Sequence, residues 1–177
     1  MVNRYLGEKS SWNLRFKYIA TIILVVFASI VSANLEYNFI LLDALPYREA
    51  RQPTMGVFYY YHLEAIIPLI GLLAFQPFIY EVLSKTRSSE GLRTTFALGV
   101  GSLLLGLILE DTGWFVFRLL TPLSSDPLAY QWIRPSDYTA SFVGYANIFG
   151  LIVPLWYMIL IPPIVAILVA LLIIPHR

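Results

Sequence analysis

The sequence predicts an all-α integral membrane protein in which four transmembrane helices form one bundle. Hydrophobic residues make up 58% of the chain and charged residues 13%, with a mean hydropathy of +0.71, whereas soluble domains carry ~25% charged residues. Four continuous apolar runs each reach the ~18 residues that a membrane-spanning helix needs; they cover about 18–35, 57–83, 94–120 and 146–174. Continuous runs exclude the alternating pattern of a membrane barrel.

The first two runs differ in their expected shape. The run at 18–35 contains neither Pro nor Gly, so we expect a straight helix. The run at 57–83 contains Pro68 and Pro77, and each proline removes a backbone donor and can kink the helix.

The third run carries small residues four positions apart, Ala97 with Gly101 and Ser102 with Gly106. Such pairs let helix backbones approach closely in lipid, which predicts that the third helix lies at the centre of the bundle. The fourth run is long enough to tilt, and its double proline at 162–163 predicts a bend near its middle. The whole chain, 1–177, is expected to form a single domain.

Basic residues predict the orientation. The first 17 residues contain four Lys or Arg, the connection at 84–93 contains three, and the chain ends in His176 and Arg177. Basic residues favour the cytoplasmic side, so both termini are predicted to be cytoplasmic in a multi-pass protein of the cell membrane. The connection at 121–145 is rich in Tyr and Trp, which favour the headgroup level, and we expect it to cap the outer end.

Composition also excludes several classes. The chain has no cysteine, which rules out iron–sulfur clusters and covalently attached haem c. A net charge of +1 leaves no basic face for nucleic acid. The expected partners are therefore the lipid bilayer and other membrane proteins, either different subunits or further copies of this chain.

Ionisable residues on three predicted helices share a similar depth. Counted from the cytoplasmic anchors Lys17, Lys85 and Arg93, all of them lie roughly 25–35 Å along the helix axes. They are Glu36, His62, Glu64, Glu110 and Asp111. This places them near the outer edge of a ~30 Å hydrocarbon layer.

One imidazole with several carboxylates favours iron, manganese or zinc, and bundle proteins build metal sites from such side chains on facing helices. We therefore predict these five residues as candidate metal ligands, although His62 and Glu64 project about 160° apart on an ideal helix. Trp114 lies four residues after Glu110, and Arg118 lies seven residues after Asp111 on the same face. These two are candidate cofactor-binding neighbours.

The alternative interpretation is structural. Charged groups at the membrane interface cost much less than charged groups at the bilayer centre. The acids would then pair with Arg48, Arg51 or Arg118, and no metal would be needed.

The order of these features resembles a known family. Glu36 ends the first run in "SANLEYNF", an aromatic stretch leads into His62 in "GVFYYYHLEAIIPLIG", and the acid pair precedes aromatic residues in "ILEDTGWFVF". This is similar to the copper-binding C-type subunit of particulate methane and ammonia monooxygenases. The resemblance implies a helical bundle with a metal-capable polar site and adds copper to the candidate metals. Only His62 falls in the corresponding helix, with no second histidine near it.

Three functional hypotheses follow. The first is a membrane metalloprotein, with a redox enzyme as one form of it. The second is a non-catalytic subunit of a larger membrane complex. The third is a small transporter or proton-coupled carrier, which the almost wholly apolar inner halves of the runs disfavour.

Overall fold

The computed structural model describes residues 2–41, 53–55, 58–59, 62–85, 88–124 and 128–173, and this part of the chain is mostly helical. The helices are α1 (Val2–Leu41), the π-helical turn η2 (His62–Ile66), α2 (Ile67–Leu83), α3 (Ser89–Leu120), the short α4 (Tyr138–Ser141) and α5 (Leu155–Ile173). Two antiparallel hairpins join β1 (Pro53–Met55) to β2 (Phe58–Tyr59) and β3 (Tyr145–Ile148) to β4 (Leu151–Pro154).

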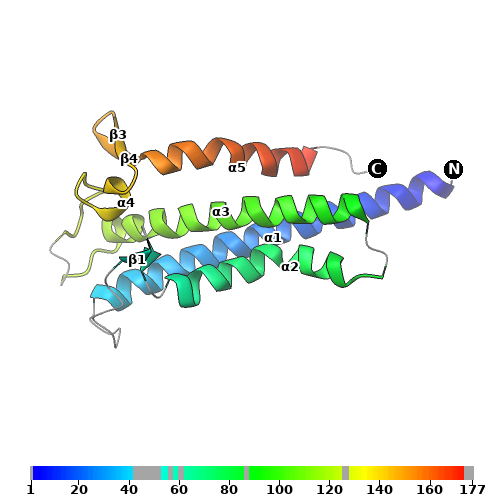
Figure 1. The fold of residues 1–177 in the computed structure, drawn as a ribbon, viewed down its shortest axis with the longest axis horizontal. Coiled ribbons are helices and arrows are strands. Elements are labelled where there is room, and N and C mark those ends of the chain that lie inside the picture. The colour runs from blue at the N-terminus through cyan, green and yellow to red at the C-terminus, as the bar shows by residue number, and fades with distance from the viewer. Residues whose placement is uncertain are drawn as a thin grey trace.

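The four long helices lie side by side (Figure 1). Helices α1 and α3 run in one direction and α2 and α5 in the other, so α1 begins at the end of the bundle where α5 finishes. Helix α3 packs against α1, α2 and α5, and α1 also packs against α2. The prediction that the third helix is central is therefore confirmed.

Small residues of α3 make this central position possible. A Cβ atom on Gly106 would lie 2.7 Å from Ile70 Cγ2 on α2 and 2.9 Å from Val25 Cγ1 on α1. A Cβ atom on Gly101 would lie 3.1 Å from Leu168 Cδ2 on α5. Gly106 therefore lets α1 and α2 approach α3, and Gly101 lets α5 approach it. Each close approach is stabilised by van der Waals contact.

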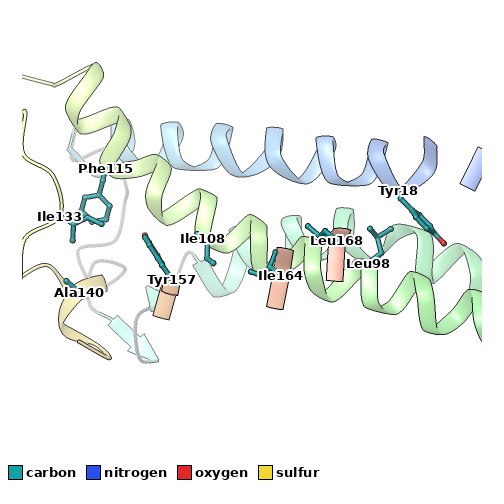
Figure 2. Close-up of a cluster of buried hydrophobic side chains, with 9 residues drawn as sticks. All are labelled: Tyr18, Leu98, Ile108, Phe115, Ile133, Ala140, Tyr157, Ile164 and Leu168. Atoms are coloured by element: carbon teal, nitrogen blue, oxygen red, sulfur yellow. The ribbon is translucent and has the colours of Figure 1, made fainter. Parts of the chain in front are cut away.

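The largest buried cluster joins α3 to α5 and to the segment that covers one end of the bundle (Figure 2). Helix α5 contributes Tyr157, Ile164 and Leu168 to it, which are spaced by seven and four residues and so share one helix face. The segment between α3 and β3 contributes Ile133 and Ala140, which are 3% and 0% exposed. This segment closes the end of the bundle, as its aromatic composition predicts.

Two helical segments are long and apolar enough to cross a membrane by length and composition, Arg15–Asn38 and Ser89–Leu120. The apolar helices Ile67–Leu83 and Leu155–Leu171 are shorter. Large hydrophobic side chains are exposed on the outer surfaces of α1, α2 and α5, among them Phe27, Leu72 and Ile159, each at least 60% exposed.

Each of the four predicted helices differs from the observed one in at least one boundary, and α3 begins at Ser89 rather than 94. Helix α1 runs beyond 18–35 at both ends, and the second helical segment begins at His62 rather than 57. The prediction of helix from 146 was wrong, because residues 145–154 form the β3–β4 hairpin and α5 begins at Leu155. Gly144 and Gly150 have positive φ values of 105° and 88°, and glycine adopts this conformation most readily. Hydropathy alone does not distinguish such a hairpin from a helical turn.

Replacement of Gly106 by Ala is expected to destabilise the bundle by ~1–3 kcal/mol, the usual cost of overpacking. The added methyl group would press on α1 and α2 together. Unfolding of the purified protein in mixed detergent micelles measures the change.

Gly71→Ala is the matched control, because nothing lies within 4 Å of a Cβ atom at that position of α2. Its stability should equal or exceed that of the wild type, since alanine is the better helix former. Equal losses for the two variants would contradict the close approach at Gly106.

Candidate functional site

The elements that carry the predicted site residues meet at one end of the bundle. The last turns of α1, the turn η2, the last third of α3 and the start of α5 all lie there (Figure 1). A fixed rise per residue makes depth along a helix predictable from sequence distance. Rotation around each helix then decides which residues face one another.

Asp111 joins α3 to α4 and α5. Its Oδ2 atom accepts a 2.7 Å hydrogen bond from Thr139 Oγ1 and a second hydrogen bond from the hydroxyl of Tyr157. Tyr157 is 5% exposed and points from α5 towards α3 (Figure 2). Two hydroxyl donors from different elements thus meet on one carboxylate oxygen of α3.

Trp156 extends this network. Its indole Nε1 donates to the backbone oxygen and to Oγ1 of Thr139, both at 3.2 Å. The donors therefore run from Trp156 through Thr139 to Asp111 and tie the first turn of α5 to α4 and α3. The hydrogen-bonded chain provides an acceptor for every donor in it, which buried polar groups require.

Arg118 is the second connection and is 1% exposed. Its Nε donates to the backbone oxygen of Gln131 at 2.9 Å, and its Nη2 donates to the backbone oxygen of Trp132 at 3.0 Å. Its guanidinium carbon lies 5.0 Å from the ring centre of Trp114 and 4.8 Å from that of Phe115. The charge is thus held between aromatic rings and carbonyl oxygens, which stabilise a desolvated cation.

Asp137 supplies the counter-charge. Its Oδ2 lies 3.4 Å from Arg118 Nη2 and accepts a 2.8 Å hydrogen bond from the backbone N–H of Arg134. Its Oδ1 accepts from Arg134 Nη2 at 2.9 Å. Asp137 therefore stabilises the turn at 134–137 through Arg134 and joins that turn to α3 through Arg118.

Asp111 and Arg118 both face the segment between α3 and α5, so the prediction that they share a helix face is confirmed. They bind different parts of it, however. Asp111 contacts Thr139, and Arg118 contacts residues 131–137.

Glu110 lies on another face of α3 and is 2% exposed. Gly106, four residues before it, faces Val25 and Ile70, and Gly113, three residues after it, faces Ala33. Residues three and four apart share a helix face, so Glu110 projects towards α1 and Asp111 towards α4 and α5. Glu36 is half-buried and lies three residues beyond Ala33 on α1, or ~5 Å further along the axis.

Trp114 packs between helices at the same level. Its ring meets Tyr37 of α1 edge-on at 5.4 Å between ring centres and Phe115 at 5.1 Å. The hydroxyl of Tyr37 accepts a 3.1 Å hydrogen bond from the backbone N–H of Leu123. The indole nitrogen of Trp114 is buried and has no acceptor among the described residues.

The described residues do not bring three or more His, Asp or Glu side chains into one metal-binding group. The side chains of His62 and Glu64 lie outside the described part of the structure, as do Arg48 and Arg51. The set Glu36, His62, Glu64, Glu110 and Asp111 therefore stays a prediction, and so do the cofactor-binding roles of Trp114 and Arg118.

Sequence reasoning missed four partners of this network: Asp137, Thr139, Trp156 and Tyr157. One local signal was present, because Arg134 and Asp137 stand three apart around Pro135, and an Asp side chain can hydrogen-bond the backbone three residues before it. The contacts of Asp111 have no local signal, since Thr139 and Tyr157 follow it by 28 and 46 residues.

No protein-family model, curated protein or solved structure matches this chain. Asp111 connects α3 to α4 and α5, and Arg118 connects α3 to residues 131–137.

Arg118→Lys is expected to destabilise the protein by ~1–3 kcal/mol, the cost of leaving a buried polar group unsatisfied. Lysine has the charge but not the planar fork that reaches two carbonyls and Asp137 together. Thermal unfolding and limited proteolysis within 121–144 measure the effect.

Arg134→Lys is the matched control, because Arg134 binds the same Asp137 from a side chain that is 39% exposed. An exposed ion pair contributes at most ~1 kcal/mol. Equal sensitivity of the two variants to protease would show that Arg118 does not hold the segment on α3.

Proposed function

We propose that this chain is a multi-pass membrane protein with four spans and with both termini in the cytoplasm. Exposed Phe27, Leu72 and Ile159 on three different helices support this proposal. A large exposed apolar surface is unfavourable in water, whereas lipid covers it without cost.

Helix lengths agree with the proposal for the two shorter segments. The 19 residues of α5 rise ~28 Å, close to the ~30 Å hydrocarbon thickness. The turn η2 has 5 residues and the following α2 has 17. At helical rise the two segments together span ~30 Å or more. Helices of this length can cross a bilayer with little tilt.

We further propose that the protein is a non-catalytic structural subunit of a membrane complex. The observation that carries this proposal is the use of Asp111 and Arg118 in internal contacts. Their hydrogen bonds go to Thr139, Tyr157 and the backbone of 131–132, so these charges hold the end of the bundle together. Contacts of this kind account for both charges through packing between elements.

The topology can be tested by cysteine labelling, because the native chain contains no cysteine. Ser136→Cys lies in the segment over the outer end, and Ser89→Cys lies at the start of α3; both positions are exposed. We expect a membrane-impermeant maleimide to label the first variant in intact cells and the second only after permeabilisation. Labelling of both variants in intact cells would contradict the four-span topology.

A metal-binding role is the second candidate, and one observation favours it. Glu110 is 2% exposed within a helix proposed to span the membrane, and a buried ionisable residue in that setting suggests a functional site. Glu36, His62 and Glu64 are its candidate co-ligands. The hydroxyl donors on Asp111 Oδ2 make that residue a weaker candidate ligand. Iron, manganese, zinc and copper all remain candidate metals.

Metal analysis of protein purified in detergent separates the two roles. The structural role predicts less than one metal ion per chain and the same value in His62→Ala. Stoichiometric metal that is lost in His62→Ala but retained in the control His176→Ala would establish the metalloprotein instead.

A further inference from the structure

The β3–β4 hairpin presents the most exposed aromatic side chain in the described part of the structure. Phe149 at its tip is 102% exposed. Other large apolar side chains of the hairpin and of the residues before it are also exposed: Phe142, Val143, Tyr145, Ile148 and Leu151. The hairpin stands at the start of α5 and projects sideways, away from α3 (Figure 1).

Phenylalanine is an unusual residue for the backbone conformation of this turn. Ile148 pairs with Leu151, so Phe149 and Gly150 form a two-residue turn with φ values of 50° and 88°. Both residues have positive φ, as in a type I′ turn, where Asn-Gly is the favoured sequence. A phenylalanine in this conformation is strained and gains no contact within the described structure to offset the strain.

Backbone groups near the tip of the hairpin are hydrogen-bonded within the hairpin. Four residue pairs join the strands, from Tyr145 with Pro154 to Ile148 with Leu151. The Asn147 side chain adds one more bond, because its Oδ1 accepts from the N–H of Gly150 at 2.9 Å. Internal pairing of this kind lowers the cost of moving a hairpin tip into a poorly hydrated layer.

The surrounding sequence indicates which surface covers the hairpin. No Asp, Glu, Lys, Arg or His occurs between Tyr138 and Pro175. The exposed apolar surface therefore continues without a charge from the hairpin into the outer face of α5, where Ile159 is 62% exposed. The preceding residues 121–137 carry Asp126, Arg134 and Asp137, so the uncharged character is specific to the hairpin and α5.

We propose that the β3–β4 hairpin inserts into the interfacial layer of the outer leaflet, with Phe149 as its anchor. This inference rests on the proposed membrane topology. Open strand edges exclude the hairpin from the hydrocarbon centre, and aromatic side chains favour the headgroup level. We infer that lipid covers this continuous uncharged surface. The hairpin then sets the depth and tilt of α5, which packs on α3 through one face only.

Single cysteines carrying the fluorophore NBD test the insertion in phosphatidylcholine vesicles that contain nitroxide-labelled lipids. Phe149→Cys should show blue-shifted emission and lose most of its fluorescence to nitroxides near the headgroup. Ser136→Cys is the aqueous control and should lose little. Ile159→Cys lies ~6 Å along α5 from Leu155, so it should be quenched best by nitroxides in the upper acyl chains, deeper than those that quench position 149.

The outcomes separate this inference from the proposed topology. Quenching at 159 without quenching at 149 overturns the hairpin anchor and leaves the spanning helix intact. Absence of lipid quenching at 159 overturns the topology itself. Protection of position 149 from both lipid nitroxides and aqueous iodide indicates a protein partner and also overturns the lipid anchor.

A second variant tests the role of Phe149 without unfolding the turn. Phe149→Asn introduces the residue that a type I′ turn favours, so the hairpin should form at least as well. An NBD label on Leu151→Cys should lose most of its shallow quenching in this background. Unchanged quenching would assign the insertion to other side chains and overturn the anchoring role of Phe149.

Discussion

The close approach of three helices to α3 is the constraint on which the rest of the structure depends. Closely packed helices gain stability from many small van der Waals contacts between their surfaces. Gly101 lets α5 approach α3, and Gly106 admits α1 and α2. The same helix carries Glu110, Asp111 and Arg118 in its last third, so the packing around α3 decides which neighbour each charge meets.

Those neighbours differ in chemistry. Towards α4 and α5, Asp111 meets two hydroxyl donors, and Arg118 meets backbone carbonyls, aromatic rings and Asp137. Because a buried polar group is costly unless it is hydrogen-bonded, these contacts make the covering segment a structural part of the bundle. Glu110 is buried on the face of α3 that packs against α1. The two adjacent carboxylates therefore lie on different faces of α3 and pack against different elements.

Part of the site could be predicted from the sequence. Depth could be estimated because helical rise is constant, and Asp111 and Arg118 were placed on one face because seven residues make almost two turns. Their partners could not be predicted, since Thr139 and Tyr157 lie 28 and 46 residues away and come from different elements. The start of the last helix was misplaced for a related reason: an uncharged hairpin and an uncharged helix have the same hydropathy.

The sequence by itself determined the properties that depend on local composition and spacing: the helical class, the long apolar segments, the central position of the glycine-containing helix and the aromatic cover of one end of the bundle. Only the tertiary structure decided the pairing of Arg118 with Asp137, the different elements that Glu110 and Asp111 face, and the projection of Phe149 from its hairpin. The physical reason is that local spacing sets the direction of a side chain within its own helix, whereas its partner depends on how distant segments pack around that helix.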